Sequence, residues 1–593
     1  MSSSDILIVP CCEPGKGGGH LSRCVNLVQD LRICGRTTWL YAGQHGLTQQ
    51  TENLLHKMNF NFEWVLTGSL PESLKIQFIV LDRFQTPLDE LLQWKKIAPV
   101  IGIDEGGKYR DCFDFLVDML IPVGIGKPLA NIADPSLLLK KNFTTNSNLR
   151  FAHEQARTIE QQRTERLLKI LISFGHEDSA GLGLRTALLL SKISKKHSLD
   201  ITLLKGVMSA NNEQITIDNV KILDSIPNLA EHLGEYDIVI THYGLTAYEA
   251  LFAGTAVLLD HPTPYHKKLA KAAGFLDIKN LKSIINSNKN KSSKIKKRFQ
   301  IKSSCGSWLI NEYSPQINRQ CPVCAENAPN KSLIRFPDRT YRRCAKCGII
   351  YMDRTNPPPF EYEKEYFFEQ YKKQYGKTYL EDFENIKNAA KRRIKIIKSL
   401  SSQPALLDIG CAYGPFLAAA LEEGFTPAGL DPAEDAVRYV QEKLGITAIH
   451  GFFPNSKLSA ASFNAITLWF VIEHFTDCVS VLSEIKKLLK KDGILAFSTP
   501  SFSGISGRAN LRRFLSASPA DHFTVWSPRM AKKALLPAGF EVKKIVITGH
   551  HPERFPLFGK FAKNRKSPLY WILLAISRIF GLGDTVEIYA GVV

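Results

Sequence analysis

Long apolar runs are missing from this chain of 593 residues, and their absence argues against a membrane-spanning helix. The longest late stretch, 569–582, is interrupted by Ser577 and Arg578 and is shorter than the ~20 residues that a bilayer span requires. We expect it to form a core or interfacial helix. We also expect no secretory leader, because Asp5 runs straight into the strand-like segment 6–9. We therefore expect a cytoplasmic protein.

Cysteines are too few for a disulfide-rich protein, and acidic residues are fewer than basic residues. Twelve cysteines in so long a chain do not make a disulfide scaffold, and 57 acidic against 76 basic residues leave a net charge of +19. Such a charge is compatible with a nucleic-acid partner. However, seven of the basic residues lie in the Ser/Asn/Lys-rich segment 289–302, which has no acidic residue. This distribution is typical of a solvated linker, with a surface for anionic lipid or a polyanionic glycan carrier as the alternative.

Apolar runs alternate with helical patterns in three successive series, and no short internal repeat is visible. The first two series predict ten strands: 6–10, 38–41, 77–82, 100–104, 115–123, 169–174, 201–204, 220–223, 237–241 and 256–260. Two such series predict two parallel-sheet subdomains, 1–145 and 146–285, which face each other across a cleft. A third series, 403–593, follows a basic linker at 286–316 and a helical stretch at 353–402.

Four cysteines in the segment 317–352 have metal-ligand spacing. Cys321 and Cys324 form one Cys-x-x-Cys pair, Cys344 and Cys347 form a second, and nineteen residues separate the pairs. Two such knuckles bring four thiolates to a tetrahedral Zn²⁺ ion, which replaces a missing core. Because the protein fills all four positions, the spacing predicts a zinc ribbon with a structural metal.

The third series opens with a strand that breaks into a glycine-containing turn. Gly410 and Gly414 allow the backbone to approach a ligand without a Cβ in the way. The next strand ends at Asp431, and an acidic group there can accept both hydroxyls of a ribose. An unrelated turn or an NAD-type dehydrogenase is the competing interpretation.

The segment 405–593 resembles the class I S-adenosylmethionine-dependent methyltransferases. Their first strand carries Asp-x-Gly-x-Gly-x-Gly and their second ends in a ribose-binding acid, which Asp408, Gly410, Gly414 and Asp431 match. Ala412 stands where the middle glycine is usual. The resemblance implies a doubly wound sheet and S-adenosylmethionine as cofactor, held by these residues.

Two histidines are candidates for a catalytic base if the acceptor is a hydroxyl or an acidic C–H. His474 follows a segment similar to the family's fourth strand, whose end faces the transferred methyl, and His522 is the second candidate. A packed or capping role stays open for both. The cysteine ribbon with the aromatic stretch after it resembles a module of methyltransferases from deoxysugar and polysaccharide pathways, which implies a sugar or glycan acceptor.

The first series contains a glycine-rich loop, 16–20, between a strand and a helix. Consecutive glycines at a helix N-terminus form an anion cradle, and His20 is a candidate base. In the second series, the segment 236–254 places a strand before a glycine turn and a helix that carries an acid.

These segments resemble the GT-B nucleotide-sugar proteins, including the hydrolases of the pseudaminic acid pathway. The resemblance implies a UDP-sugar or related substrate. The residues it implicates are Gly18 and Gly19 beside the sugar and diphosphate, His20 as base, Gly244 and Thr246 near the phosphates, and Glu249 at the ribose. The sequence departs from the family at 175–178 and at Tyr265-His266, where Gly-Gly-Ser and Asn-Gln or Gln-Gln are common.

The sequence thus predicts an α/β protein: a GT-B-like pair of Rossmann-type subdomains, a zinc ribbon, a helical acceptor or lid segment, and a methyltransferase domain. We expect a bifunctional enzyme that methylates a sugar or small molecule and hydrolyses or transfers a nucleotide-activated sugar. The alternatives are a zinc-ribbon RNA methyltransferase and a methyltransferase on a non-catalytic nucleotide-sugar-binding scaffold. Nucleic acid is the less favoured partner, and peripheral membrane contact stays open.

Overall fold

The computed structural model describes the following residues: 5–11, 19–120, 129–138, 167–175, 178, 180–195, 198–205, 216–224, 226, 229–281, 317, 320–327, 331–354, 376–401 and 403–593. The chain divides into two units, Met1–Ser314 with Arg335–Asp338, and Pro315–Ile334 with Arg339–Val593. Three predicted features lie outside the described residues: Gly18, the linker 286–316, and residues 355–375 of the helical segment.

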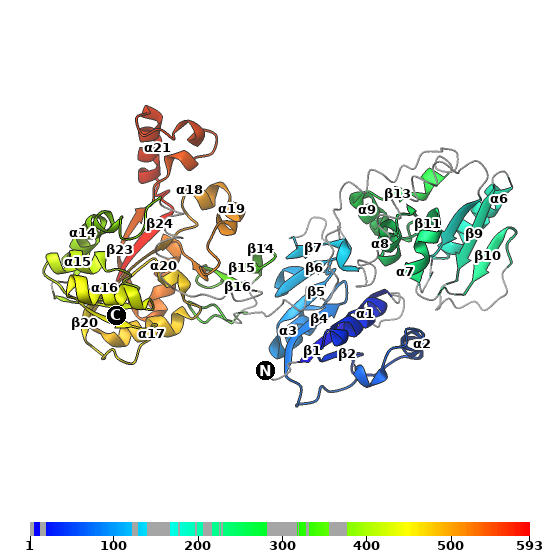
Figure 1. Ribbon diagram of the computed structural model, residues 1–593, viewed down its shortest axis with the longest axis horizontal. Coiled ribbons are helices and arrows are strands. Elements are labelled where there is room, and N and C mark those ends of the chain that lie inside the picture. The colour runs from blue at the N-terminus through cyan, green and yellow to red at the C-terminus, as the bar shows by residue number, and fades with distance from the viewer. Residues whose placement is uncertain are drawn as a thin grey trace. The chain divides into compact units, whose positions relative to one another are not determined.

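The first unit opens with a parallel sheet in the order β3-β2-β1-β4-β5-β6-β7 (Figure 1). Its strands are β1 (Asp5–Pro10), β2 (Thr38–Tyr41), β3 (Val65–Leu66), β4 (Ile76–Asp82), β5 (Val100–Ile103), β6 (Phe115–Asp118) and β7 (Ile132–Ala133). Helices α1 (Gly19–Ile33) and α2 (Gln49–Lys57) pack on one face, and α3 (Leu88–Ile97) packs on the other. Because both faces are covered, the strands are almost continuously apolar.

A second parallel sheet in the same unit has the order β10-β9-β8-β11-β12-β13. The strands are β8 (Leu168–Ile172), β9 (Leu199–Leu204), β10 (Val220–Leu223), β11 (Ile238–Thr241), β12 (Ala256–Leu259) and β13 (Leu276–Asp277). Its helices are α6 (Leu182–Ser194), α7 (Leu229–His232), α8 (Leu245–Phe252) and α9 (Pro264–Ala273). The predicted pair of parallel sheets is therefore confirmed.

Two predicted strands are shorter in the structure. The strand expected at 100–104 ends at Ile103, because Asp104 adopts a left-handed conformation with φ 47°. The strand expected at 115–123 ends at Asp118. The backbone N–H groups of Met119 and Leu120 donate to the Asp104 carboxylate at 2.7 and 2.8 Å, which turns the chain off the sheet.

The second unit contains a seven-stranded sheet in the order β19-β18-β17-β20-β21-β24-β23. Its strands are β17 (Ala405–Ile409), β18 (Thr426–Asp431), β19 (Thr447–His450), β20 (Phe463–Trp469), β21 (Leu489–Pro500), β23 (Phe540–Thr548) and β24 (Thr585–Val592). All neighbours run parallel except β24, which is antiparallel to both β21 and β23. The structure thus has the predicted doubly wound α/β architecture in this region.

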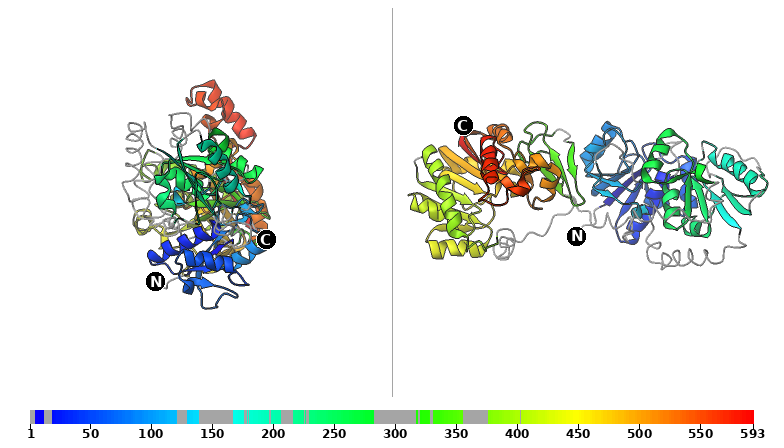
Figure 2. Two further views of the ribbon diagram at one scale, coloured as in Figure 1. Left: turned by 90° about the vertical axis from the view of Figure 1, so that its right-hand side faces the viewer. Right: turned by 90° about the horizontal axis from the view of Figure 1, so that it is seen from above.

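Helices cover both faces of this sheet (Figure 2). One core contains α14 (Phe383–Leu400), α15 (Pro415–Glu422) and α16 (Glu434–Leu444). The opposite core contains α17 (Cys478–Leu488) and α20 (Pro528–Leu535). Adjacent residues of β17 illustrate the separation: Leu406 packs with the first group and Leu407 with the second, as alternation along a strand requires.

A small sheet, β14-β15-β16-β22, adjoins this domain. Its strands are β14 (Ser332–Arg335), β15 (Arg339–Arg343), β16 (Ile350–Arg354) and β22 (Thr524–Val525). β16 belongs to the cysteine segment, whereas β22 belongs to the seven-stranded domain, and the two pair antiparallel. The cysteine segment therefore joins the domain through backbone hydrogen bonds.

The late apolar stretch forms the helix α21 (Pro568–Ile579), which lies between β23 and β24 in sequence and projects from the sheet (Figure 1). Among the helices of the described residues, none combines the length and the apolarity needed to cross a bilayer.

Candidate active sites

The turn between β17 and α15 is built for close backbone approach. Gly410 and Gly414 have φ angles of 74° and 77°, which favour glycine. A Cβ on Gly410 would lie 2.5 Å from Cγ2 of Val471, so the position has no room for a side chain. Ala412, which replaces the expected middle glycine, also adopts a positive φ of 47°. The turn therefore keeps its left-handed geometry without that glycine.

Asp431 ties this turn to the end of β18. Its carboxylate is almost fully buried and accepts hydrogen bonds from the backbone N–H groups of Ala412 at 2.8 Å and Ala433 at 2.9 Å. Burial raises the pKa of Asp431, although these two bonds favour the charged form. Each carboxylate oxygen has a second lone pair with which it can accept a hydroxyl.

Asp408 lies underneath the turn rather than on its surface. It is buried, and its Oδ1 accepts a hydrogen bond from the Thr467 hydroxyl at 2.6 Å. Burial raises the pKa of Asp408 to about 7, partly opposed by the bond from Thr467 and the charge of Arg393. Asp408 thus links the neighbouring strands β17 and β20 and supports the turn from below.

The two candidate bases meet beside the end of β20. The rings of His474 and His522 are 4.8 Å apart and nearly perpendicular. His474 Nδ1 lies 2.9 Å from the Asp521 carboxylate. Burial opposes the charged imidazolium, but the Asp521 hydrogen bond and the Glu473 charge outweigh it and raise the pKa of His474. Burial and the neighbouring His474 lower the pKa of His522 to about 3.

Two acids of this cluster, Glu473 and Asp521, were not predicted from the sequence. Burial raises the pKa of Glu473, which is completely buried, to about 7 despite the nearby His474. Asp521 shows the opposite shift, because the hydrogen bond from His474 overcomes burial and lowers the pKa of Asp521 to about 2. Each acid directly precedes one of the two histidines in the sequence, and this was the signal that could have identified them. One ligand atom each from Glu473, His474 and His522 lies within 4.8 Å of the others, a donor set that also suits a divalent metal.

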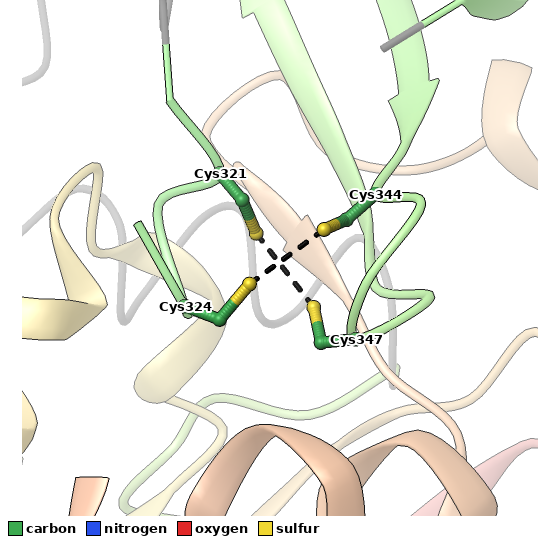
Figure 3. A group of neighbouring side chains, drawn as sticks. All are labelled: Cys321, Cys324, Cys344 and Cys347. Carbon is green, nitrogen blue, oxygen red and sulfur yellow. Dashed lines mark hydrogen bonds between the residues drawn. The ribbon is translucent and has the colours of Figure 1, made fainter. Parts of the chain in front are cut away.

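The four predicted cysteine ligands converge on one point (Figure 3). Sγ atoms lie 3.7 Å apart for Cys321 and Cys347 and 3.6 Å apart for Cys324 and Cys344. Zn–S bonds of ~2.3 Å in a tetrahedron place the sulfur atoms about 3.8 Å apart. The cluster therefore has the spacing that tetrahedral zinc requires.

The two Cys-x-x-Cys knuckles repeat one backbone geometry. In the first, the Ala325 N–H donates to the carbonyl of Cys321 at 2.9 Å, and in the second the Gly348 N–H donates to Cys344 at 3.0 Å. Ala325 and Gly348 both have positive φ, 54° and 82°. Each turn thereby directs two sulfur atoms to the same side.

In the first unit, His20 belongs to a buried charged network. Gly19 and His20 open α1, as predicted, and His20 Nδ1 lies 2.5 Å from Oδ1 of Asp82 at the end of β4. Arg23 bridges Asp82 at 2.7 Å and Asp104. Burial would raise the pKa of Asp82, but the charges of Arg23 and His20 outweigh it and hold the pKa well below its usual range. Asp82 was not predicted, although it is the acid that ends a strand.

The other predicted residues of this unit lie around the start of α8. Gly244 is the residue before the helix, and its φ of 172° is ordinary extended backbone that other residues also adopt. Thr246 and Glu249 lie in the first two turns of α8 and are half-buried. The preceding His242 stacks against Phe174 with ring centroids 6.2 Å apart.

His242 is an unpredicted member of this group. Burial and the neighbouring His266 lower the pKa of His242 to about 4, so the ring is neutral at physiological pH. The Tyr265 ring lies 5.9 Å from Phe84, which follows β4 of the first sheet. Residues from the two sheets therefore approach each other here.

Comparisons with known proteins concern the second unit. Residues 381–545 match the family model described as "Methyltransferase domain". This part of the chain is a methyltransferase domain. The match begins at residue 381, just before α14, and so includes part of the segment 353–402 that we predicted to precede the domain.

Two curated relatives of the methyltransferase domain are ubiquinone biosynthesis O-methyltransferases. The protein from Actinobacillus pleuropneumoniae serotype 5b (strain L20) is 36% identical over 104 residues, which cover 16% of this chain and 44% of that protein. The protein from Histophilus somni (strain 2336) is 29% identical over 131 residues, or 20% of this chain and 55% of that protein. The chain thus spans about half the length of these relatives.

Solved structures with detectable similarity include two S-adenosylmethionine-dependent methyltransferases. The enzyme from Archaeoglobus fulgidus has 20% identity and a TM-score of 0.29, covering 37% of this chain and 98% of that chain. A possible histamine N-methyltransferase from Thermotoga maritima has 19% identity and a TM-score of 0.28, covering 39% of this chain and 100% of that chain.

Proposed function

We propose that the methyltransferase domain transfers a methyl group from S-adenosylmethionine to a hydroxyl of a sugar or glycan. One observation carries the cofactor half of this proposal: buried Asp431 accepts a hydrogen bond from Ala412 in the turn bounded by Gly410 and Gly414. A strand-end acid fastened to a glycine turn is the arrangement that grips an adenosine ribose beside a close backbone.

The residues of the turn fit the cofactor. Asp431 would accept hydrogen bonds from the ribose hydroxyls, and the backbone from Gly410 to Gly414 would lie against the rest of the molecule. S-adenosylmethionine, when bound, supplies an electrophilic methyl group on a sulfonium. The protein's own part is alignment and the exclusion of water.

His474 is the residue that we propose as the base. Its Nδ1 faces Asp521 at 2.9 Å, which orients the ring and leaves Nε2 as the atom that takes the proton from an acceptor hydroxyl. His522, with its lowered pKa, stays neutral beside it and would contact the acceptor. The curated relatives are named as O-methyltransferases, which supports oxygen as the accepting atom.

For the first unit we propose binding of a nucleotide-activated sugar, with hydrolysis or transfer of the sugar. The paired parallel sheets and the position of His20 at the start of α1 support this proposal. Asp82 holds His20 by its Nδ1, so the opposite ring nitrogen would act as the base. Glu249, in α8, is the proposed ribose ligand.

The cysteine cluster is proposed to hold a structural Zn²⁺ ion. The sulfur spacing of 3.6 to 3.7 Å and the duplicated knuckle geometry support this assignment. Four protein ligands complete a tetrahedron, so the ion would stabilise the ribbon and take no direct part in catalysis.

A labelling assay tests the function. The full chain is incubated with S-adenosylmethionine carrying a labelled methyl group and with UDP-sugars, free glycans or RNA. We expect label in a sugar or glycan, and loss of labelling in His474→Gln. Label in RNA instead would contradict the sugar proposal, and labelling unaffected by His474→Gln would contradict the assigned base.

A further inference from the structure

Exposed apolar side chains concentrate in one element of the second unit. The segment 555–583 contains α21 and the chain that leads into it from β23. Seven large apolar side chains of this segment are each between 55% and 81% exposed: Leu557, Phe558, Phe561, Trp571, Ile572, Ile579 and Phe580. Isolated exposed apolar residues are ordinary, but a cluster of this kind marks an interaction surface.

The charge of the same segment has a single sign. Five basic residues and no acidic residue occur between 555 and 583: Lys560, Lys563, Arg565, Lys566 and Arg578. All five are exposed. The acids at its borders are engaged elsewhere, because Asp584 pairs with Arg554 at 3.0 Å and Glu553 with His551 at 2.9 Å. The surface thus combines apolar and aromatic side chains with uncompensated positive charge.

The element is firmly anchored on its inner side. Leu573, Leu574 and Ser577 of α21 are buried, and His550 Nδ1 lies 2.7 Å from the Ser577 hydroxyl. At the other end, a Cβ on Gly583 would lie 2.1 Å from the carbonyl oxygen of Thr548, so the two chain segments are in close contact. The outward apolar face is therefore presented by a packed helix.

We propose that the segment 555–583 docks the protein on a membrane surface that contains anionic lipids. Trp, Phe, Leu and Ile would enter the boundary between headgroups and acyl chains while Lys and Arg contact the lipid phosphates, the composition of an interfacial helix. The twelve residues of α21 are too few to cross a bilayer, so the helix lies in the interface plane.

The charge argues against a second copy of the chain as the occupant. A two-fold symmetric contact through this face would place the five basic residues of one copy opposite the same five of the other. No acid in the segment would offset that repulsion. An anionic lipid surface removes the repulsion and covers the same apolar side chains.

Vesicle co-sedimentation of the full chain tests the proposal. Vesicles of phosphatidylcholine alone are compared with vesicles in which about one third of the lipid is phosphatidylglycerol. We expect binding to the anionic vesicles that weakens as salt is raised, because screening reduces the attraction. The charge variant Lys563→Glu, Arg565→Glu, Lys566→Glu should bind at least about tenfold more weakly.

Matched variants distinguish the contribution of the segment 555–583 from a general effect of changing exposed charge or exposed apolar surface. The charge control is Lys443→Glu, Lys457→Glu, Lys491→Glu, which reverses three exposed lysines elsewhere in the same unit. The apolar variant Trp571→Ser, Phe580→Ser is paired with Phe452→Ser, Leu536→Ser, whose side chains are 71% and 60% exposed. We expect both controls to bind like the unchanged protein and the apolar variant to bind weakly.

Three results would overturn the proposal: no binding to anionic vesicles, equal loss in element and control variants, or self-association that the element variants abolish without any vesicle binding. Melting temperatures of all variants show whether they are folded. The assay does not involve methyl transfer, so its outcome is independent of the proposed function.

Discussion

The backbone N–H of Met352, in the cysteine ribbon, donates a hydrogen bond of 2.9 Å to the carbonyl oxygen of Phe523 in the methyltransferase domain. Phe523 in turn donates its own N–H to the Glu473 carbonyl at 2.7 Å. The residue before Phe523 is His522, and the residue after Glu473 is His474. The ribbon strand therefore fixes the loop that brings the two histidines together.

Removal of the proposed zinc should loosen this loop. Without the metal the two knuckles of the ribbon lose the ion that joins them, so β16 should hold β22 and the residues before it less firmly. We expect a chelator to increase amide hydrogen exchange in residues 516–526, measured by mass spectrometry, with little change in α16. Metal loss without faster exchange in this segment would contradict the coupling.

Gly410→Ala should destabilise the methyltransferase domain by about 3 kcal/mol, from left-handed strain and from overlap with Val471. Gly445→Ala is the control, because Gly445 has a φ of 66° but no atom within 4 Å of an added Cβ, so only the strain remains, roughly 1 kcal/mol. Calorimetry of the full chain measures both. Adding Val471→Ala should restore part of the loss, and equal effects of the two glycine changes would refute the steric argument.

Asp521→Asn should lower the pKa of His474, because the carboxylate that favours its imidazolium is lost. The raised pKa of His474 contributes stability below pH ~6.5 that disappears as the pH rises through the folded-state value. The lowered pKa of Asp521, about 2, contributes stability above pH ~3.9 that disappears on acidification. The variant's stability loss should thus be largest between about pH 4 and pH 6.5.

NMR titration of the imidazole signals measures the pKa of His474 directly, and the variant His474→Gln assigns its resonance. An unchanged titration midpoint for His474 in Asp521→Asn would show that the pair has no energetic importance.

Asp82→Ala should destabilise the first unit by about 3 kcal/mol, because it strips buried Arg23 of one of its two acids. Asp260→Ala is a matched control: it breaks the ion pair with Arg185, which is 66% exposed, and should cost less than about 1 kcal/mol. In the unchanged protein the Asp82 contribution is present above pH ~3.9 and is lost on further acidification, since its pKa is held down. Urea unfolding checks the order, and similar losses in the two variants would contradict it.

Local patterns in the sequence predicted much of the architecture. The ten strands predicted in the first unit are all present, and the missed strands β3, β7 and β13 have only two residues each, too short for a period-two signal. The spacing of the cysteines predicted their cluster, and the strand end at Asp431 predicted its position beside the turn. These features depend on neighbouring residues.

Long-range contacts were beyond such patterns. Asp521 meets His474, and β22 meets β16, across segments that only the tertiary structure brings together. The early end of the strand at Asp118 arises from the side chain of Asp104, which directly follows another strand, β5. Burial, and therefore every pKa shift in these sites, also depends on the complete packing.

Calorimetric titration of the full chain with S-adenosylhomocysteine tests the central claim most directly. We expect one binding site in the methyltransferase domain and binding at least about tenfold weaker in Asp431→Asn, because the amide can accept at one atom only. The control Glu434→Gln, a neighbouring side chain that is 68% exposed, should bind like the unchanged protein. Absence of heat with the unchanged protein, or equal affinity in Asp431→Asn, would contradict the account.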